Sequence, residues 1–185
     1  CPHILAEPQR TNLVTYSEDF SNAYWNKVVG TYTPDLITAP DGTQSMGAFE
    51  NTTANGRLSN TTTITSNDAT HSGYYKAKDS DYIFIRAIGF DDTISIHFNL
   101  VNGTFNITEG SPVGKMEDFG NGIYRCSMSF TTTTSLTATW YLYPTNSPTL
   151  SGQIGDSYYI WGAQLEAGSY ATSYIPTSGS TVTRN

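Results

Sequence analysis

The side chains best suited to chemistry in this sequence are aromatic rings and basic groups that alternate with apolar residues along short stretches. Six of them stand out: Tyr74, Lys76, Arg86, His97, Arg125 and Tyr141. Around His97, for example, Ile96 and Phe98 take the other parity, so the ring is expected on the polar face of a strand. If these strands share one sheet, its outer face presents all six side chains together.

Such a face has the chemistry of a sugar-binding platform. Flat rings stack on the C–H face of a pyranose, while Arg, Lys and His donate hydrogen bonds to hydroxyl or carboxylate groups. A guanidinium binds a carboxylate through two parallel N–H groups, which favours an acidic sugar. The same pattern is also typical of any half-exposed sheet, where Arg and Tyr cover neighbouring apolar surface. Loop aromatics near one end, Tyr24, Trp25 and Tyr32, offer a second candidate site.

Two carboxylates and one amide could hold a metal ion. Asp19 and Asp41 lie in expected turns, and Gln164 lies on the last long strand, which in a sandwich could run beside the first. Calcium prefers oxygen ligands, so these three side chains predict a structural calcium ion that ties the two ends of the domain together. No twelve-residue calcium loop is present, and solvated turn carboxylates are the alternative.

Groups for catalysis are scarce. The three histidines, His3, His71 and His97, are far apart in the sequence and show neither the HxH nor the HExxH spacing of metal sites. No GxSxG motif marks a serine nucleophile. The adjacent acidic pairs at 91–92 and 117–118 are expected in turns, where solvated carboxylates are the ordinary explanation. The sequence therefore predicts no enzymatic activity.

Short stretches rich in β-branched and aromatic residues must position these side chains. Strand signals recur at 12–16, 25–32, 46–50, 57–64, 71–77, 82–90, 93–100, 103–107, 122–130, 136–143 and 157–166. Gly, Asn, Asp and Pro separate them at intervals of roughly 8–12 residues, a spacing typical of a sandwich or jelly roll. No helical pattern alternates with these strands, which excludes a nucleotide-binding α/β sheet. We expect an all-β fold, an antiparallel two-sheet β-sandwich of the jelly-roll type.

The last of these strands is the one around which the others are expected to assemble. Its side chains alternate, and one set is expected to face the core: Tyr159, Trp161, Ala163 and Leu165. A Trp and a Leu on one face need an opposing layer. This strand is therefore expected in the middle of a sheet and not at an edge.

The length fits one domain. A chain of 185 residues can bury roughly 70% of the surface that its unfolded form exposes, so one core is sufficient. Residues 1–11 contain two prolines and no clean periodicity, and they are expected to form a lead-in linker or strap. A single β-sandwich domain is expected over 12–185. Both ends of the chain look cut, which indicates a piece of a longer protein.

The charge balance excludes several partners. The formal net charge is −7, whereas binding to nucleic acid or to an anionic membrane needs clustered Lys and Arg. No apolar run reaches the roughly 18 residues that membrane insertion requires. Cys126 alternates with apolar residues and is expected to be a small buried side chain. Cys1 could pair with it or carry a lipid, and both alternatives stay open.

Two end segments and three internal motifs carry a resemblance to a known family. The end segments are EPQRTNLVTYSEDFSNAYW at 7–25 and YYIWGAQLEAGSYATSYIPTSGSTVTR at 158–184. Between them follow APDGT at 39–43, YYKAK at 74–78 and NGIYR at 121–125. This pattern covers nearly the whole chain and resembles modules found in phage tail and fibre proteins and in secreted bacterial proteins. Those modules are in turn similar to jelly-roll carbohydrate-binding modules.

The resemblance implies a β-sandwich that binds a glycan without catalysis and often holds calcium near its termini. In such modules an acidic residue after the first strand and an Asp in the last strand are frequent calcium ligands. Asp19 matches the first of these, whereas Gln164 stands roughly where the Asp would be.

We therefore expect an extracellular, non-catalytic polysaccharide-binding module that favours an acidic glycan. It would be attached to a secreted enzyme or displayed on a phage tail or fibre. The alternative is a structural virion or fibre component that forms homo-oligomers and binds no sugar.

Overall fold

The computed structural model describes residues 7–65, 68–89, 93–132, 136–149 and 151–184. These residues form strands and turns, in keeping with a composition rich in Thr, Tyr and Gly. The strands are β1 (Arg10–Asn12), β2 (Asn26–Val28), β3 (Gly30–Ile37), β4 (Met46–Asn51), β5 (Arg57–Ile64), β6 (Asp68–Ala77), β7 (Tyr82–Ile88), β8 (Ile94–Asn99), β9 (Thr104–Glu109), β10 (Val113–Asp118), β11 (Ile123–Thr131), β12 (Leu136–Thr145), β13 (Ser157–Ala167) and β14 (Val182–Arg184).

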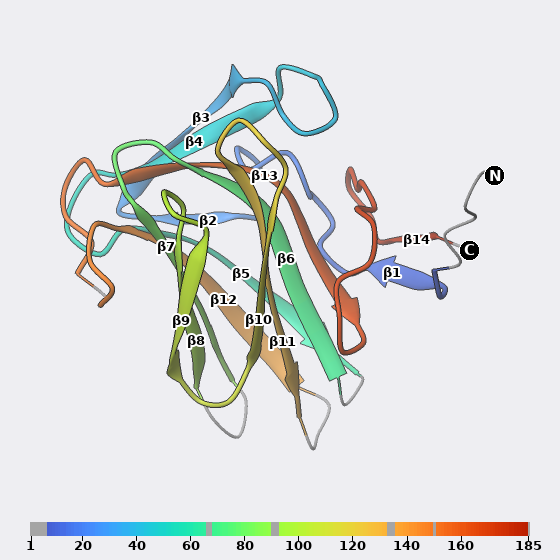
Figure 1. Ribbon diagram of the computed structural model, residues 1–185. Coiled ribbons are helices and arrows are strands. Elements are labelled where there is room, and N and C mark those ends of the chain that lie inside the picture. Colours follow the sequence, from blue (N-terminus) through green and yellow to red (C-terminus); the bar gives the residue numbers. More distant parts are fainter. Residues whose placement is uncertain (1–6, 66–67, 90–92, 133–135, 150, 185) are drawn as a thin grey trace.

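Two antiparallel sheets of six strands each pack face to face (Figure 1). Sheet I has the order β10-β11-β6-β13-β4-β3, and sheet II has the order β2-β5-β12-β7-β8-β9. The short strands β1 and β14 pair with each other at one end of the molecule, where Leu13 also bonds to Leu165 of β13. The expected fold, an antiparallel two-sheet β-sandwich of the jelly-roll type, is confirmed.

The core between the sheets is built from side chains at every second position of the strands. Sheet II contributes Ile83, Ile85, Trp140 and Leu142. Sheet I contributes Tyr75, Cys126 and Met128. Each of these side chains is at most 2% exposed, and burying one large apolar side chain stabilises a fold by about 1.5–3 kcal/mol. The expectation of a buried Cys126 is confirmed, whereas Cys1 lies outside the described residues.

Strand β13 lies in the middle of sheet I, between β6 and β4, as its pattern predicts. Its pairing with β6 shifts register between Trp161 and Gln164, and within this bulge Gly162 adopts a φ of 62°. A Cβ atom at Gly162 would lie 2.9 Å from Cδ2 of Tyr74, so a larger residue would clash there as well as strain the backbone. The extra residue in the bulge exchanges the two faces of the strand.

Because of this bulge, half of the inward set expected for β13 is wrong. The main core receives Tyr158, Ile160, Ala163 and Leu165. The outer face of sheet I receives Tyr159 and Trp161. Strict alternation would put Tyr159 and Trp161 on the same side of the sheet as Ala163 and Leu165. The residue pattern of a strand does not reveal where a bulge interrupts the alternation.

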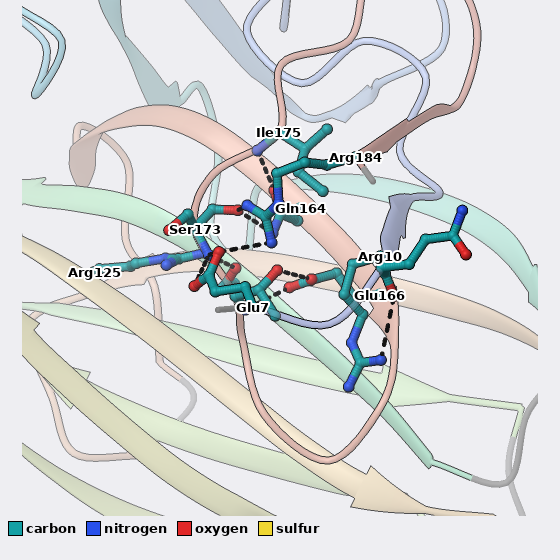
Figure 2. A network of polar contacts seen from close by, with 11 residues as sticks. Glu7, Arg10, Arg125, Gln164, Glu166, Ser173, Ile175 and Arg184 are labelled. Carbon is teal, nitrogen blue, oxygen red and sulfur yellow. Dashed lines mark hydrogen bonds and ion pairs between the residues drawn. The ribbon is translucent and has the colours of Figure 1, made fainter. Parts of the chain in front are cut away.

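The two ends of the domain are held together by β1, β14 and a polar network (Figure 2). The register pairs Arg10 with Arg184. The Glu7 carboxylate accepts the Ser173 N–H at 3.0 Å and pairs with Nη2 of Arg184 at 2.7 Å. Strand β1 therefore begins two residues before the expected start of the sandwich at residue 12.

The sequence does not predict β10, which lies at the edge of sheet I. An edge strand buries only part of one face, so its apolar alternation is weak. Glu117 and Asp118, expected in a turn, are the last residues of this strand and pair with Arg125 and Tyr124. The other acidic pair, at 91–92, lies outside the described residues, as does His3.

Candidate functional site

The six expected platform residues lie on two different sheets. Sheet I holds Tyr74, Lys76 and Arg125. Sheet II holds Arg86, His97 and Tyr141. Their neighbours at the other parity fill the core between the sheets, so the two groups point to opposite sides of the sandwich. The condition for a single platform, that these strands share one sheet, is not met.

On sheet I, Tyr74 and Arg125 are buried. Arg125 is only 6% exposed, its Cζ lies 5.4 Å from the centre of the Tyr74 ring, and its Nη2 donates to Ser72 Oγ at 3.1 Å. Trp161 packs edge-on against Tyr74, and Tyr174 of the C-terminal segment packs against both rings. Burial raises the pKa of Tyr74. This cluster is a second, smaller core. Tyr74 and Trp161 are at most 4% exposed, so neither ring presents an open face to a ligand.

On sheet II, the strand register aligns outward side chains in rows across the sheet. One row runs through Asn26, Ser59, Tyr141, Arg86, Ser95 and Glu109. A neighbouring row includes Arg57, Tyr143, Phe84 and His97. Strands in a sheet lie about 4.8 Å apart, so the members of each row have a regular spacing. Ser95 is completely buried, and Tyr143, Phe84 and His97 are at most 6% exposed, so only part of each row is open to a ligand.

Three members of the first row, Asn26, Ser59 and Tyr141, line a hollow of about 390 Å³ on the outer face of sheet II. Tyr141 and Tyr24 supply its aromatic rings, and Arg57 supplies its positive charge. Val28 and a set of hydroxyl and amide groups complete the lining: Asn26, Ser59, Asn60, Thr61 and Thr139. None of the described residues that line this hollow is acidic. Rings beside hydrogen-bonding groups are the combination that a concave ligand site uses to orient a small polar molecule.

A second hollow, of about 250 Å³, lies further along sheet II. In it Arg86 donates to both carboxylate oxygens of Glu109, at 2.9 and 3.1 Å. His97 stacks on Phe84 with ring centres 4.1 Å apart, and burial lowers the pKa of His97 to about 4. At neutral pH the imidazole is therefore neutral and the Arg86 charge is balanced. This part of the face is polar without a net charge.

Tyr24 reaches the first hollow from a loop that a single ammonium group organises. Nζ of Lys27 donates to backbone carbonyls of this loop at 2.9–3.1 Å: those of Phe20, Ser21, Asn22 and Trp25. The Tyr24 hydroxyl then donates to Oδ1 of Asn60 at 3.1 Å. Of the second candidate set, Trp25 is instead buried in the core, and Tyr32 packs against it.

Arg57 was missed as a site residue. It begins the expected strand 57–64 and shares the polar parity of Ser59 and Thr61, so alternation alone could have placed it on this face.

The three expected calcium ligands do not form a ligand set. Asp19 and Asp41 are exposed, and each carboxylate accepts hydrogen bonds from its own turn. Gln164 is fully buried; its Oε1 accepts the Ile175 N–H at 2.7 Å, and its Nε2 donates to the Ser173 carbonyl at 3.3 Å (Figure 2). Within the described part of the chain, no group of three or more His, Cys, Asp or Glu side chains could hold a metal ion. These residues do not fit the expected ion, and the Gln164 amide itself ties the C-terminal segment to β13.

Calcium removal is therefore expected to leave the stability of the domain unchanged. A ligand raises stability only where the folded state has a site for it, so the melting temperature should differ by less than about 1 °C between millimolar calcium and millimolar EDTA. Thermal unfolding followed by circular dichroism measures this, with magnesium as the control for ionic strength. A rise of several degrees that calcium alone produces would contradict the result.

Neither a family model nor a curated protein matches the sequence. Among solved structures, the chain is similar to the enzymatically active domain of tailspike protein 4 of bacteriophage CBA120, with 10% identity and a TM-score of 0.51. That match covers 83% of this chain but only 21% of the tailspike chain. At so low an identity the likeness shows the fold alone.

Two further solved structures are similar at lower TM-scores. The CBM22-1 xylan-binding domain from Paenibacillus barcinonensis Xyn10C is 11% identical, with a TM-score of 0.49, and the match covers 87% of this chain and 94% of that one. TmCBM61, solved with β-1,4-galactotriose, is 10% identical, with a TM-score of 0.40, and the match covers 83% of this chain and 97% of that one.

None of the described residues form a helix long and apolar enough to cross a membrane.

Proposed function

We propose that this domain binds a polysaccharide across the outer face of sheet II, without catalysing a reaction on it. The hollow of about 390 Å³ supports this most directly, because a tyrosine ring, a guanidinium and several hydroxyl groups converge there. A sugar presents C–H faces to a ring and hydroxyl groups to donors and acceptors, so it matches both kinds of lining. Arg86 and Glu109, which lie further along the first row and are partly exposed, extend the polar surface beyond the hollow towards a second sugar unit.

The lining of the hollow also supports binding rather than cleavage. Hydrolysis of a glycosidic bond ordinarily uses two carboxyl groups, one as acid and one as base or nucleophile. The described residues that line the first hollow include neither Asp nor Glu, and in the second hollow Glu109 is paired with Arg86. We place the domain outside the cell, attached to a secreted enzyme or to a phage tail or fibre. There it would hold the attached enzyme or virion on an acidic glycan. Linkage to another module makes weak single-site binding useful.

Replacing Tyr141 by alanine is expected to weaken polysaccharide binding at least about 30-fold, the loss of a central aromatic contact in an interface. Tyr141 is half-buried at the floor of the hollow, and Arg57 lies over its ring. Affinity electrophoresis in a panel of neutral and acidic polysaccharides measures the retention of the wild type and the variant. Tyr170→Ala is the matched control, because Tyr170 is 51% exposed and lines neither described hollow of sheet II.

Equal retention of the wild type and Tyr141→Ala would contradict the assignment of the hollow. Failure of the wild type to bind any polysaccharide would instead favour the structural, self-assembling alternative. In that case the exposed Phe105 and Ile107 on the edge strand β9 are the residues to examine for contacts between copies.

A further inference from the structure

Arg57 differs from Arg86, the other arginine on this face of sheet II, in having no acidic partner among the described residues. Arg86 is held by Glu109. The guanidinium of Arg57 instead lies over two rings, with its Cζ 5.0 Å from the centre of Tyr141 and 5.6 Å from that of Tyr143. None of the ion pairs formed among the described residues includes Arg57. No carboxylate in the described part of the chain therefore balances its charge.

One N–H group of Arg57 also lacks an acceptor among the described residues. A guanidinium carries five N–H donors, and a buried donor without a partner costs free energy. The Nε of Arg57 is buried and has no hydrogen-bond partner in the described part of the chain. The two tyrosine rings hold the group by cation–π contact, which keeps the charge in place without using its N–H groups. Because Nε is buried, a ligand that enters the hollow would accept hydrogen bonds from the terminal Nη groups.

We infer that Arg57 binds an anionic group of the glycan, a carboxylate or a sulfate ester, while Tyr141 beside it stacks on a sugar ring. The inference rests on the proposed function and names the ligand chemistry of that same hollow. Both anions present paired oxygens that match the two parallel N–H groups of a guanidinium. Because the chain carries a net charge of −7, long-range attraction does not draw in an acidic polymer, and the preference must come from this local contact.

Pairs of polymers that differ only in charge test this inference. Uronic-acid polysaccharides are compared with their carboxyl-reduced forms, and a sulfated galactan is compared with its desulfated form, by affinity electrophoresis and calorimetry. We expect the wild type to bind a charged form about tenfold more tightly than its neutral counterpart, as one charge-assisted contact provides. Arg57→Gln should abolish this difference, and Arg57→Lys, which keeps the charge but not the fork, should keep part of it.

Arg10→Gln is the matched control, because it removes the same charge from β1, outside both hollows of sheet II. It should leave the preference unchanged, and Tyr141→Ala should weaken binding of charged and neutral forms alike. Thermal unfolding shows whether Arg57→Gln folds. If it does not fold, Arg57→Lys replaces it in the test, and a smaller preference of that variant for the charged polymer supports the inference.

Each outcome is decisive. A preference for either charged form that depends on Arg57 supports the inference, and the polymer pair that shows it identifies the group. If Arg57→Gln keeps the preference, the inference fails while the proposed function stands. If the wild type binds neutral and charged forms equally, the inference and the proposed acidic glycan fail, while the proposed polysaccharide binding stands. If the wild type binds none of the polymers in either form, both fail.

Discussion

Replacing Asn12 by alanine is expected to lower the free energy of unfolding by about 3 kcal/mol. The Asn12 side chain is completely buried. Its Nδ2 donates to the carbonyls of Ala163 at 3.3 Å and Ile175 at 2.8 Å, and its Oδ1 accepts the N–H groups of Val14 and Leu165, both at 3.1 Å. One amide therefore joins β1, the bulge of β13 and the C-terminal segment. Alanine would remove all of these bonds at once and leave buried backbone groups without this partner.

Urea unfolding measures this loss, which corresponds to a melting temperature lower by roughly 6–12 °C in a domain of this size. The matched control is Asn106→Ala, an exposed asparagine on the edge strand β9, for which a change within about 0.5 kcal/mol is expected. A loss below about 1 kcal/mol for Asn12→Ala would show that water replaces the amide, and that this side chain does not hold the ends together.

Acidification from about pH 7 to about pH 4.5 is expected to cost the wild type about 2 kcal/mol more stability than it costs His71→Leu. His71 is 1% exposed and stacks on Trp140 with ring centres 4.8 Å apart. Its register partners on the two neighbouring strands are Met128 and Leu165, and neither ring nitrogen has a hydrogen-bond partner among the described residues. Burial lowers the pKa of His71 from 6.5 to about 4.

The sign of the effect follows from that shift. The unfolded chain takes up a proton near pH 6.5, whereas folded His71 stays neutral until about pH 4. The stability that depends on neutral His71 is therefore complete above pH 6.5 and is lost as the pH falls from 6.5 towards 4. Leucine has no such proton to gain, and it suits the apolar neighbours of this position.

Urea unfolding of both proteins across this pH range provides the measurement. Burial also lowers the pKa of His97 to about 4, so His97→Gln is measured beside His71→Leu to separate the two histidines. An acid loss as large in His71→Leu as in the wild type would contradict the prediction and assign the effect to other groups.

Local patterns are sufficient to predict much of this fold. Alternation in the expected strands 82–90 and 136–143 places Ile85 and Leu142 inside, and both are completely buried. The period of two depends only on neighbouring residues along one strand, so it can be recognised without knowing the partner strands. The Pro-Asp-Gly turn is equally local, and Asp41 accepts the Thr43 N–H within it, as its residue types predict.

The candidate site can be predicted from the sequence only in part. Tyr141, Arg86 and His97 do share one outer face, because their strands are neighbours in sheet II. The stacking of Arg57 on Tyr141 and Tyr143 brings together residues more than 80 positions apart, and no pattern within either strand contains that information.

The sequence by itself determined the alternation along most strands, many of the turns, and hence that the protein is a sandwich of antiparallel strands; it did not reveal the bulge in β13 or the strand β10. The tertiary structure alone decided which sheet each strand joins and what covers its outer face. Tyr74 and Arg125 have the pattern of exposed residues, yet both are buried. The bulge at Gly162 exchanges the two faces of β13, so that Trp161 lies on the outer face and packs with Tyr174 over Tyr74. Alternation arises from the geometry of one strand, whereas sheet order and covering arise from contacts between distant segments, which a local pattern does not encode.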